Sequence, residues 1–182
     1  MIALMEAAST EFETLVRQFE PRLFSYAMRI IGDSGRAHDV VQEVFVQLEK
    51  RLRAPGNDVT AKWLYTVCRH RALNVVRKER RLAFVTEEVL DRDESSAEMP
   101  PQQLQHKEAA GFLLRIVSTL PPRQQEVLQL RFQNDLSYQE ISDITELTVS
   151  NVGVLIHTAL KTLRQKYALA ATDFVSVKPP RH

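Results

Sequence analysis

Cysteine, glycine and long apolar runs are scarce in this chain. Its 182 residues include one cysteine, Cys68, and five glycines. A single cysteine excludes an internal disulfide and any metal site built from several cysteines, and its amphipathic surroundings predict a small buried hydrophobe. No apolar run approaches the length of a membrane span, and the first residues are too few and too acidic for a signal peptide. We therefore expect a cytoplasmic protein without membrane insertion.

Catalytic signatures are missing as well. The chain has no glycine-rich phosphate loop, no cluster of metal ligands and no nucleophile with a base at useful spacing. Its histidines are scattered along the chain, at His38, His70, His106, His157 and His182. We expect no catalytic residue, no metal and no cofactor, so an enzyme is the least favoured class of protein.

The net charge of +1 hides two blocks of opposite sign. From Arg69 to Arg81 there are six basic residues and one acid, whereas residues 86–100 contain six acids and one base. Such blocks act on different partners, so a small net charge is compatible with a nucleic-acid partner for the basic block. The 44% of hydrophobic and 26% of charged residues are typical of a folded globular protein.

Helical periodicity runs through most of the sequence and predicts an all-α protein. We expect two small helical domains joined by a flexible acidic linker. The expected bounds are 1–81 for the first domain, 82–106 for the linker, 107–168 for the second domain and 169–182 for a frayed tail.

The first domain should contain three or four helices. Thr10 and Glu13 form a capping box that predicts the start of the first helix, which ends near Gly32 and kinks or restarts at Pro21. The other two are expected at about 36–53, capped by Asp33 or Ser34, and at about 60–81, with Trp63 in the core.

The segment 136–164 has the pattern of a helix-turn-helix, a common way to place a helix in the major groove of DNA. Ser137 and Glu140 form a capping box for its first helix, and Thr148 is the expected N-cap of its second. Glu146 stands near the turn position that favours a left-handed glycine. A residue other than glycine is tolerated there at a cost of roughly 1 kcal/mol. The helices of this domain are expected at about 107–119, 122–133, 137–145 and 148–166.

Together these patterns resemble one protein family. The sequences DVVQEVF (39–45) and WLYTVCR (63–69), the basic block, the linker and the helix-turn-helix have the order and spacing of a bacterial RNA polymerase sigma factor. The resemblance is to the extracytoplasmic-function (ECF) group of the sigma-70 family, and it covers about residues 10–166. It implies a sigma-2-like and a sigma-4-like domain in a non-catalytic subunit. Such a subunit recognises the −35 and −10 promoter elements and melts the latter.

The resemblance implies several partners. They are promoter DNA and core RNA polymerase, through the clamp helices of its largest subunit and the flap of its second-largest subunit. An anti-sigma factor is expected, and the free protein is expected to be a monomer. The polymerase-binding residues implied are Asp39, Gln42, Glu43 and Phe45. Carboxylates and an amide at i, i+3 and i+4 suit an arginine-rich partner.

The resemblance assigns the basic helix to the −10 element. Cations give strong phosphate contacts without sequence preference, and melting requires flipped bases to be held. The family usually has Asn at the position of His70 and Asp at that of Asn74. These two differences bear on which −10 bases are preferred and leave the melting role intact. The −10 residues implied are Tyr65, Arg69, His70, Arg71, Asn74, Arg77, Lys78, Arg80 and Arg81.

The second domain is assigned to the −35 element. The family usually carries arginines at the positions of Leu155 and Thr158, and their absence here predicts weaker or altered −35 reading. Direct readout then falls to Ser150, Asn151 and Gly153, the last because a missing side chain allows close approach. The −35 residues implied are Ser137, Thr148, Ser150, Asn151, Gly153, His157, Lys161 and Arg164.

Two alternatives stay open at this point. A stand-alone dimeric helix-turn-helix repressor or activator explains the second half of the chain, although it has no use for DVVQEVF and WLYTVCR. The acidic linker either occupies a basic channel of the polymerase or serves only as a tether.

Overall fold

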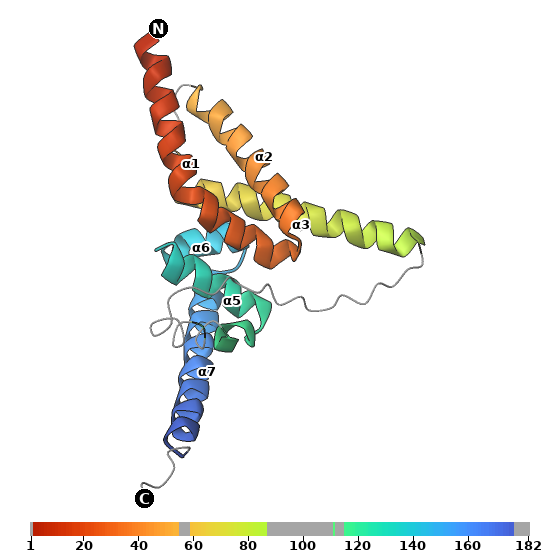
Figure 1. The fold of residues 1–182 in the computed structure, drawn as a ribbon, viewed down its shortest axis with the longest axis vertical. Coiled ribbons are helices and arrows are strands. Elements are labelled where there is room, and N and C mark those ends of the chain that lie inside the picture. Colours follow the sequence, from red (N-terminus) through yellow and green to blue (C-terminus); the bar gives the residue numbers. More distant parts are fainter. Residues whose placement is uncertain (1, 55–58, 87–110, 112–114, 177–182) are drawn as a thin grey trace, which may run out of the picture. The chain divides into compact units, whose positions relative to one another are not determined.

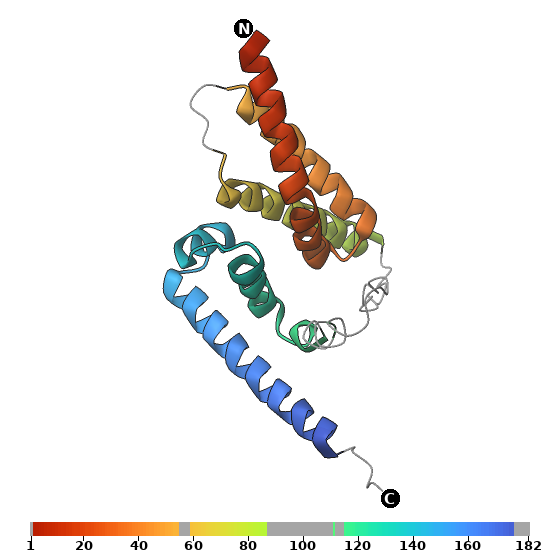
Figure 2. The same cartoon turned by 60° about the vertical axis from the view of Figure 1, so that its left-hand side comes forward.

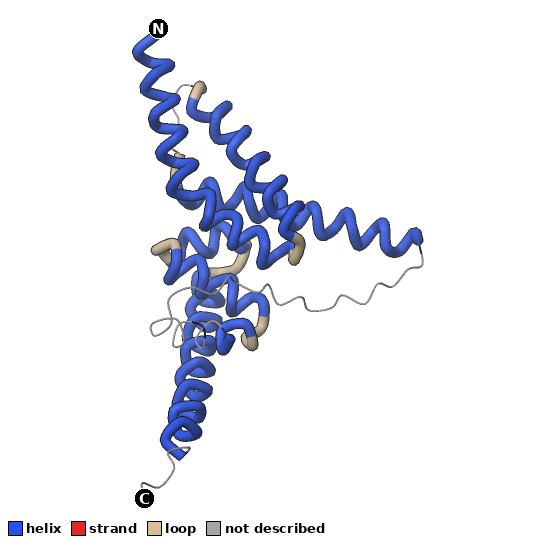
Figure 3. The backbone as a smooth tube through the Cα atoms, in the orientation of Figure 1, coloured by secondary structure: helices blue, strands red, loops and turns tan. Residues whose placement is uncertain are grey.

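The computed structural model describes residues 2–54, 59–86, 111 and 115–176, and its elements are all helices (Figure 3). They form two compact units. The first unit contains α1 (Ile2–Ile31), α2 (Ser34–Leu52) and α3 (Ala61–Thr86). The second contains α5 (Pro122–Leu128), the π-helix η1 (Gln129–Gln133), α6 (Tyr138–Thr145) and α7 (Val149–Ser176). The predicted all-α architecture of two small units is confirmed.

In the first unit, α1 and α2 form an antiparallel hairpin that α3 crosses (Figures 1 and 2). Tyr26 of α1 and Tyr65 of α3 meet edge to face, with ring centroids 5.3 Å apart. Such pairs contribute about 0.5–1.5 kcal/mol beyond the area they bury. The largest fully buried side chains of these three helices are Leu23, Tyr26, Val44, Leu48, Leu64, Tyr65 and Cys68. This core fixes which sides of α2 and α3 face solvent.

The start of α1 differs from the prediction. The helix begins at Ile2, so Thr10 lies inside it and the predicted cap is wrong; the Thr14 hydroxyl donates to the Thr10 carbonyl over 2.8 Å. The preceding residues include alanine, glutamate and leucine, which favour helix and extend it through the capping pattern. Pro21 lies within α1 without ending it. Pro21 has no amide proton to donate to the carbonyl four residues before it, at Arg17, and the helix continues through this position.

The second helix begins as predicted, with Asp33 as N-cap accepting a 2.9 Å bond from the Arg36 amide. Two helices extend beyond their predicted ends. Residues 82–86, assigned to the linker, continue α3, and residues 169–176, assigned to the tail, continue α7. Neither stretch contains a glycine or proline that would end a helix. The rest of the predicted linker, residues 107–110 and 112–114 of the helix predicted at 107–119, and residues 177–182 lie outside the described residues.

In the second unit, residues 115–118 are helical, and Pro122 then lies in the first turn of α5, where its missing amide proton costs nothing. Its next turn widens into η1, and the Asn134 side chain donates to the Gln129 carbonyl over 3.2 Å. The Leu136 amide then donates to the Leu130 carbonyl, also over 3.2 Å. These bonds satisfy buried polar groups and lead the chain into the helix-turn-helix.

The helix-turn-helix has the predicted local geometry. The Ser137 amide donates to Glu140 Oε2 over 2.8 Å and the Glu140 amide donates to Ser137 Oγ over 3.2 Å, which is a complete capping box. Glu146 adopts a left-handed φ of 60°, at the turn position where a glycine is usual. Thr148 Oγ1 accepts from the Asn151 amide over 3.2 Å and caps α7. The orientation of α7 is therefore set by local bonds as well as by packing.

The lone cysteine offers a first prediction. Cys68 is fully buried, and burial raises the pKa of its thiol to about 12. Since the thiolate is the reactive form, iodoacetamide should leave Cys68 unmodified in the native protein at neutral pH. Mass spectrometry along a urea series should show labelling only where the first unit unfolds. Rapid labelling without urea would contradict this packing.

Candidate functional site

The exposed side of α2 presents a short row of polar side chains. Asp39, Gln42 and Glu43 face solvent. The opposite side of the helix packs into the core through Ala37, Val40, Val41, Val44 and Leu48. Phe45, predicted to bind the polymerase, is only 9% exposed. That assignment is wrong, because the helical repeat places residue 45 beside 41, 44 and 48 on the buried side.

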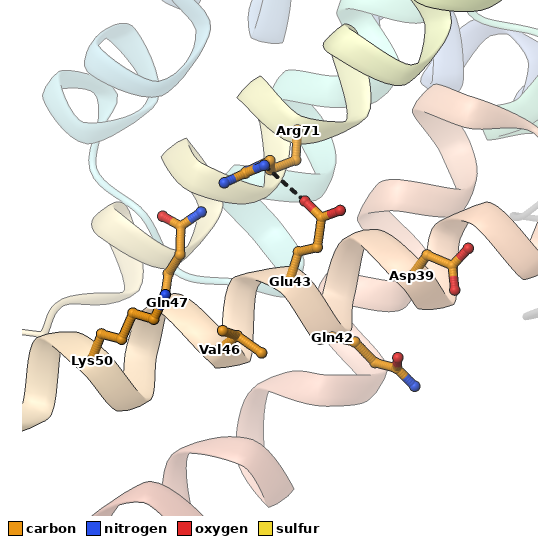
Figure 4. A pocket seen from close by; sticks show the side chains of 7 residues that line it. All are labelled: Asp39, Gln42, Glu43, Val46, Gln47, Lys50 and Arg71. Carbon is orange, nitrogen blue, oxygen red and sulfur yellow. Dashed lines mark ion pairs between the residues drawn. The ribbon is translucent and has the colours of Figure 1, made fainter.

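Arg71 of α3 reaches this row (Figure 4). Its Nη1 lies 2.9 Å from Glu43 Oε2. With the Gln47 amide oxygen turned toward it, Arg71 also donates from Nη2 over 2.5 Å and from Nε over 3.1 Å. The ion pair is half-exposed and contributes about 0.2–1 kcal/mol to stability, so its main effect is on side-chain orientation. Arg71, which is predicted to bind DNA, is thus held by α2 beside Glu43, which is predicted to bind the polymerase.

The same side chains line an open hollow of about 490 Å³. Asp39, Gln42 and Lys50 supply polar groups, and Val46, at 52% exposed, supplies an apolar one. Carboxylates that surround an exposed apolar group suit a protein surface that carries arginine, because guanidinium binds carboxylate bidentately and its stem packs on apolar groups.

Tyr65, predicted to bind the −10 element, is fully buried. Its ring packs on Tyr26, and burial raises the pKa of its hydroxyl well above the ordinary value. This prediction is wrong, because the side chain has no surface to offer a base. Trp63, predicted for the core, is half-buried, and its ring lies 5.0 Å below the guanidinium of Arg51.

The outward side of α3 is basic. Arg69 is half-buried, and the Arg77 guanidinium donates to Asn74 Oδ1 over 3.0 Å. Glu79, the acid in this stretch, forms an ion pair with Arg36 of α2. The exposed members of the predicted −10 set are His70, Arg71, Asn74, Arg77, Lys78, Arg80 and Arg81. With its acid paired, α3 offers a row of cations suited to a phosphate backbone.

The solvent-facing side of α7 carries most of the predicted −35 set. Ser150 and Asn151 in its first turns are exposed, whereas Ser137 and Thr148, also exposed, use their hydroxyls in helix caps. Farther along the helix, the exposed members are His157, Lys161 and Arg164. In the first turns of α7, the side-chain oxygens of Ser150 and Asn151 are therefore not used to cap a helix.

Gly153 does not lie on the solvent-facing side. It is half-buried, and a Cβ added there would lie 3.7 Å from Tyr138 Cε2 of α6. The space beside this glycine faces the neighbouring helix, which argues against the expectation that it lets DNA approach closely.

Comparisons with known proteins follow this division into two units. The family "Sigma-70 region 2" matches residues 15–82, and "Sigma-70, region 4" matches residues 113–163. The ECF RNA polymerase sigma factor EcfG of Rhodopseudomonas palustris is 30% identical over 160 residues, which cover 85% of this chain and 84% of that protein. The chain belongs to the ECF sigma factors. It is therefore a transcription initiation factor that directs RNA polymerase to promoters, and a stand-alone repressor is not favoured.

Other relatives of this sigma factor agree. SigE of Mycolicibacterium smegmatis is 29% identical over 172 residues, and the match covers 92% of this chain and 66% of SigE. The fold is also that of the sigma factor RpoE from Bartonella quintana, solved in complex with the anti-sigma factor NepR. That match has a TM-score of 0.64 and 20% identity, and it covers 85% of this chain and 95% of RpoE.

Two further findings concern the described part of this sigma factor. Residues 2–54, 59–86, 111 and 115–176 contain no group of histidines, cysteines and acids that would hold a metal, and within them no helix is long and apolar enough to cross a membrane.

Sequence reasoning missed Val154, which is 59% exposed on α7. Its position four residues after Ser150 was a usable signal, because the helical repeat places the two residues on one side of the helix.

Gly153→Ala should stabilise the second unit of this sigma factor by about 0.5–1 kcal/mol, because alanine favours helix and its methyl fits against Tyr138. Urea unfolding followed by helical circular dichroism measures the change. Promoter affinity of the holoenzyme should stay within about twofold of the parent. A large loss of affinity with unchanged stability would instead return Gly153 to the DNA interface.

Proposed function

We propose that the two units divide the work of promoter recognition between separate helix faces. The exposed face of α2 binds the clamp helices of the polymerase's largest subunit, α3 holds and melts the −10 element, and α7 reads the −35 element. The observation that carries this proposal is the separation of charge in the first unit. Asp39 and Glu43 are exposed on α2, while the exposed side of α3 is a row of cations.

The polymerase contact rests on the chemistry of the α2 hollow. Glu43 is oriented by Arg71, and Asp39 lies one helical turn before it on the same helix. A pre-oriented carboxylate such as that of Glu43 loses less side-chain entropy when a guanidinium binds. The contact of the second unit with the flap of the second-largest subunit is proposed from the family alone.

Melting of the −10 element rests on α3. Four cations of α3 suit the phosphate backbone of a separated strand: Arg77, Lys78, Arg80 and Arg81. The flipped bases of that strand have left the duplex stack and are held in pockets of the protein. His70 and Asn74 are exposed near the start of this row. We infer that they set the preferred −10 bases, since they depart from the residues usual in the family.

The remaining partners are proposed by analogy. RpoE of Bartonella quintana was solved with the anti-sigma factor NepR. We propose an anti-sigma factor that covers the polymerase-binding face of this chain, a monomeric free state and a cytoplasmic location. The acidic residues between the two units either enter a basic channel of the polymerase or act as a tether.

The −10 proposal is tested by the salt dependence of promoter binding. Arg80→Gln with Arg81→Gln removes two exposed cations from α3. Log affinity falls linearly with log salt, and removing one phosphate-binding cation should make this fall less steep by about 0.7–0.9. The slope for holoenzyme should therefore fall by about one to two, and 2-aminopurine placed at −10 should report slower melting. Arg17→Gln with Arg22→Gln, exposed on α1, is the matched control. Equal slopes for both double variants would overturn the role of α3.

A further inference from the structure

The solvent-facing side of α7 has an apolar residue at its centre. Val154 is 59% exposed, among the most exposed large hydrophobic side chains described. The helical repeat places polar neighbours one turn before it, one turn after it and two turns after it. These exposed neighbours are Ser150, Asn151, His157, Thr158 and Lys161. Together with Val154 they form what we call the reading face of α7.

The reading face is set by packing on the other side of the helix. Val152, Ile156 and Ala159 are at most 2% exposed. The cap at Thr148 fixes where the helix begins. Val154 therefore has no core position available to it and stays in solvent when the protein is free.

The charge of this helix favours a polyanion as the occupant of the reading face. Between residues 149 and 168, α7 contains Lys161, Arg164 and Lys166 and no aspartate or glutamate. Lys161 lies on the reading face, and the face begins in the first helical turn, where amide protons point outward. Duplex DNA meets these requirements, because cations bind its phosphates while the first turns enter the major groove.

Valine can read only one feature of a base pair in the major groove. It has no hydrogen-bond donor or acceptor, and the thymine methyl is the apolar group that the base edges present there. Asn151, one turn before Val154, has the amide that pairs bidentately with adenine N6 and N7. The two side chains together are matched to A·T pairs rather than to guanine.

We propose that Val154 is a specificity-determining residue that contacts a thymine methyl in the −35 element, with Asn151 reading an adenine nearby. This inference rests on the proposed function, because it takes α7 as the helix that enters the groove. It adds to the proposed function the bases that α7 recognises, thymine through its methyl group and adenine through its hydrogen-bonding edge.

The test removes one methyl group from the DNA. Holoenzyme made from the full chain and core polymerase selects bound sequences from a library randomised over the −35 region. In duplexes of the selected sequence, each thymine is then replaced in turn by deoxyuridine, which lacks only the methyl. One replacement should lower affinity about threefold to fourfold, the value for one buried methyl-sized group.

Two variants link this decrease in affinity to the side chain. With Val154→Ala, the difference between thymine and deoxyuridine at that position should disappear. Val149→Ala is the matched control, because Val149 is a valine of the same helix, 39% exposed but outside the reading face, and it should keep the difference. Circular dichroism checks that both variants fold.

The outcomes separate the two proposals. If the selection returns no −35 motif, the role of α7 as a promoter reader is overturned together with this inference. If a motif is returned but no thymine shows a methyl effect, or the effect survives Val154→Ala, the inference about Val154 is overturned and the proposed function stands.

Discussion

Replacing Asp39 and Glu43 together by arginine should weaken binding to core RNA polymerase by about 100-fold or more. Both carboxylates are exposed on α2 and line the same hollow. Losing one partner of a desolvated charge pair at an interface costs about 2–5 kcal/mol, and reversed charges add repulsion. Glu43→Arg also sets a guanidinium against Arg71, which now pairs with Glu43. Fluorescence anisotropy of labelled protein with core polymerase, at physiological salt, measures the change in affinity.

The matched control is Glu13→Arg with Glu20→Arg. These acids are exposed on α1 and give the same change of net charge. The control should bind core polymerase within about twofold of the parent. Equal weakening in the two double variants would mean that total charge, rather than the α2 face, governs binding.

Tyr65→Ala should destabilise the first unit by about 3–5 kcal/mol, the usual cost of truncating a buried aromatic side chain. Tyr65 is fully buried and its ring meets that of Tyr26. Trp63 is the single tryptophan of the chain and lies on α3, so its fluorescence along a urea series reports this unit specifically.

Leu82→Ala is the control for Tyr65→Ala. Leu82 is on the same helix but is 57% exposed, so its truncation should change the free energy of unfolding by less than about 0.5 kcal/mol. If Tyr65→Ala left stability unchanged and weakened promoter binding instead, the ring would be a stacking platform after all.

Local patterns predicted much of the fold. The caps at Asp33 and Ser137 and the left-handed turn at Glu146 depend on residues within a few positions of one another, and all three are confirmed. The cap at Thr10 failed for a physical reason. A capping pattern starts a helix only where the preceding residues do not already form one, and here residues 2–9 are helical.

The candidate site was less accessible to sequence reasoning. Periodicity placed the exposed acids of α2 and the polar first turns of α7. For Phe45 and Tyr65, family position and aromatic chemistry suggested roles that burial excludes. The ion pair of Arg71 with Glu43 joins two helices, and no local pattern reveals such a pairing.

Mapping transcript starts in a reconstituted system tests the central claim most directly. Purified chain, core RNA polymerase and genomic DNA of the encoding bacterium are combined, and the 5′ ends of the transcripts are sequenced. We predict starts that core polymerase alone does not give. They should share −35 and −10 elements at constant spacing and disappear with Asp39→Arg and Glu43→Arg. Starts no different from those of core polymerase alone, together with sequence-specific DNA binding by a dimer of the free chain, would contradict the account.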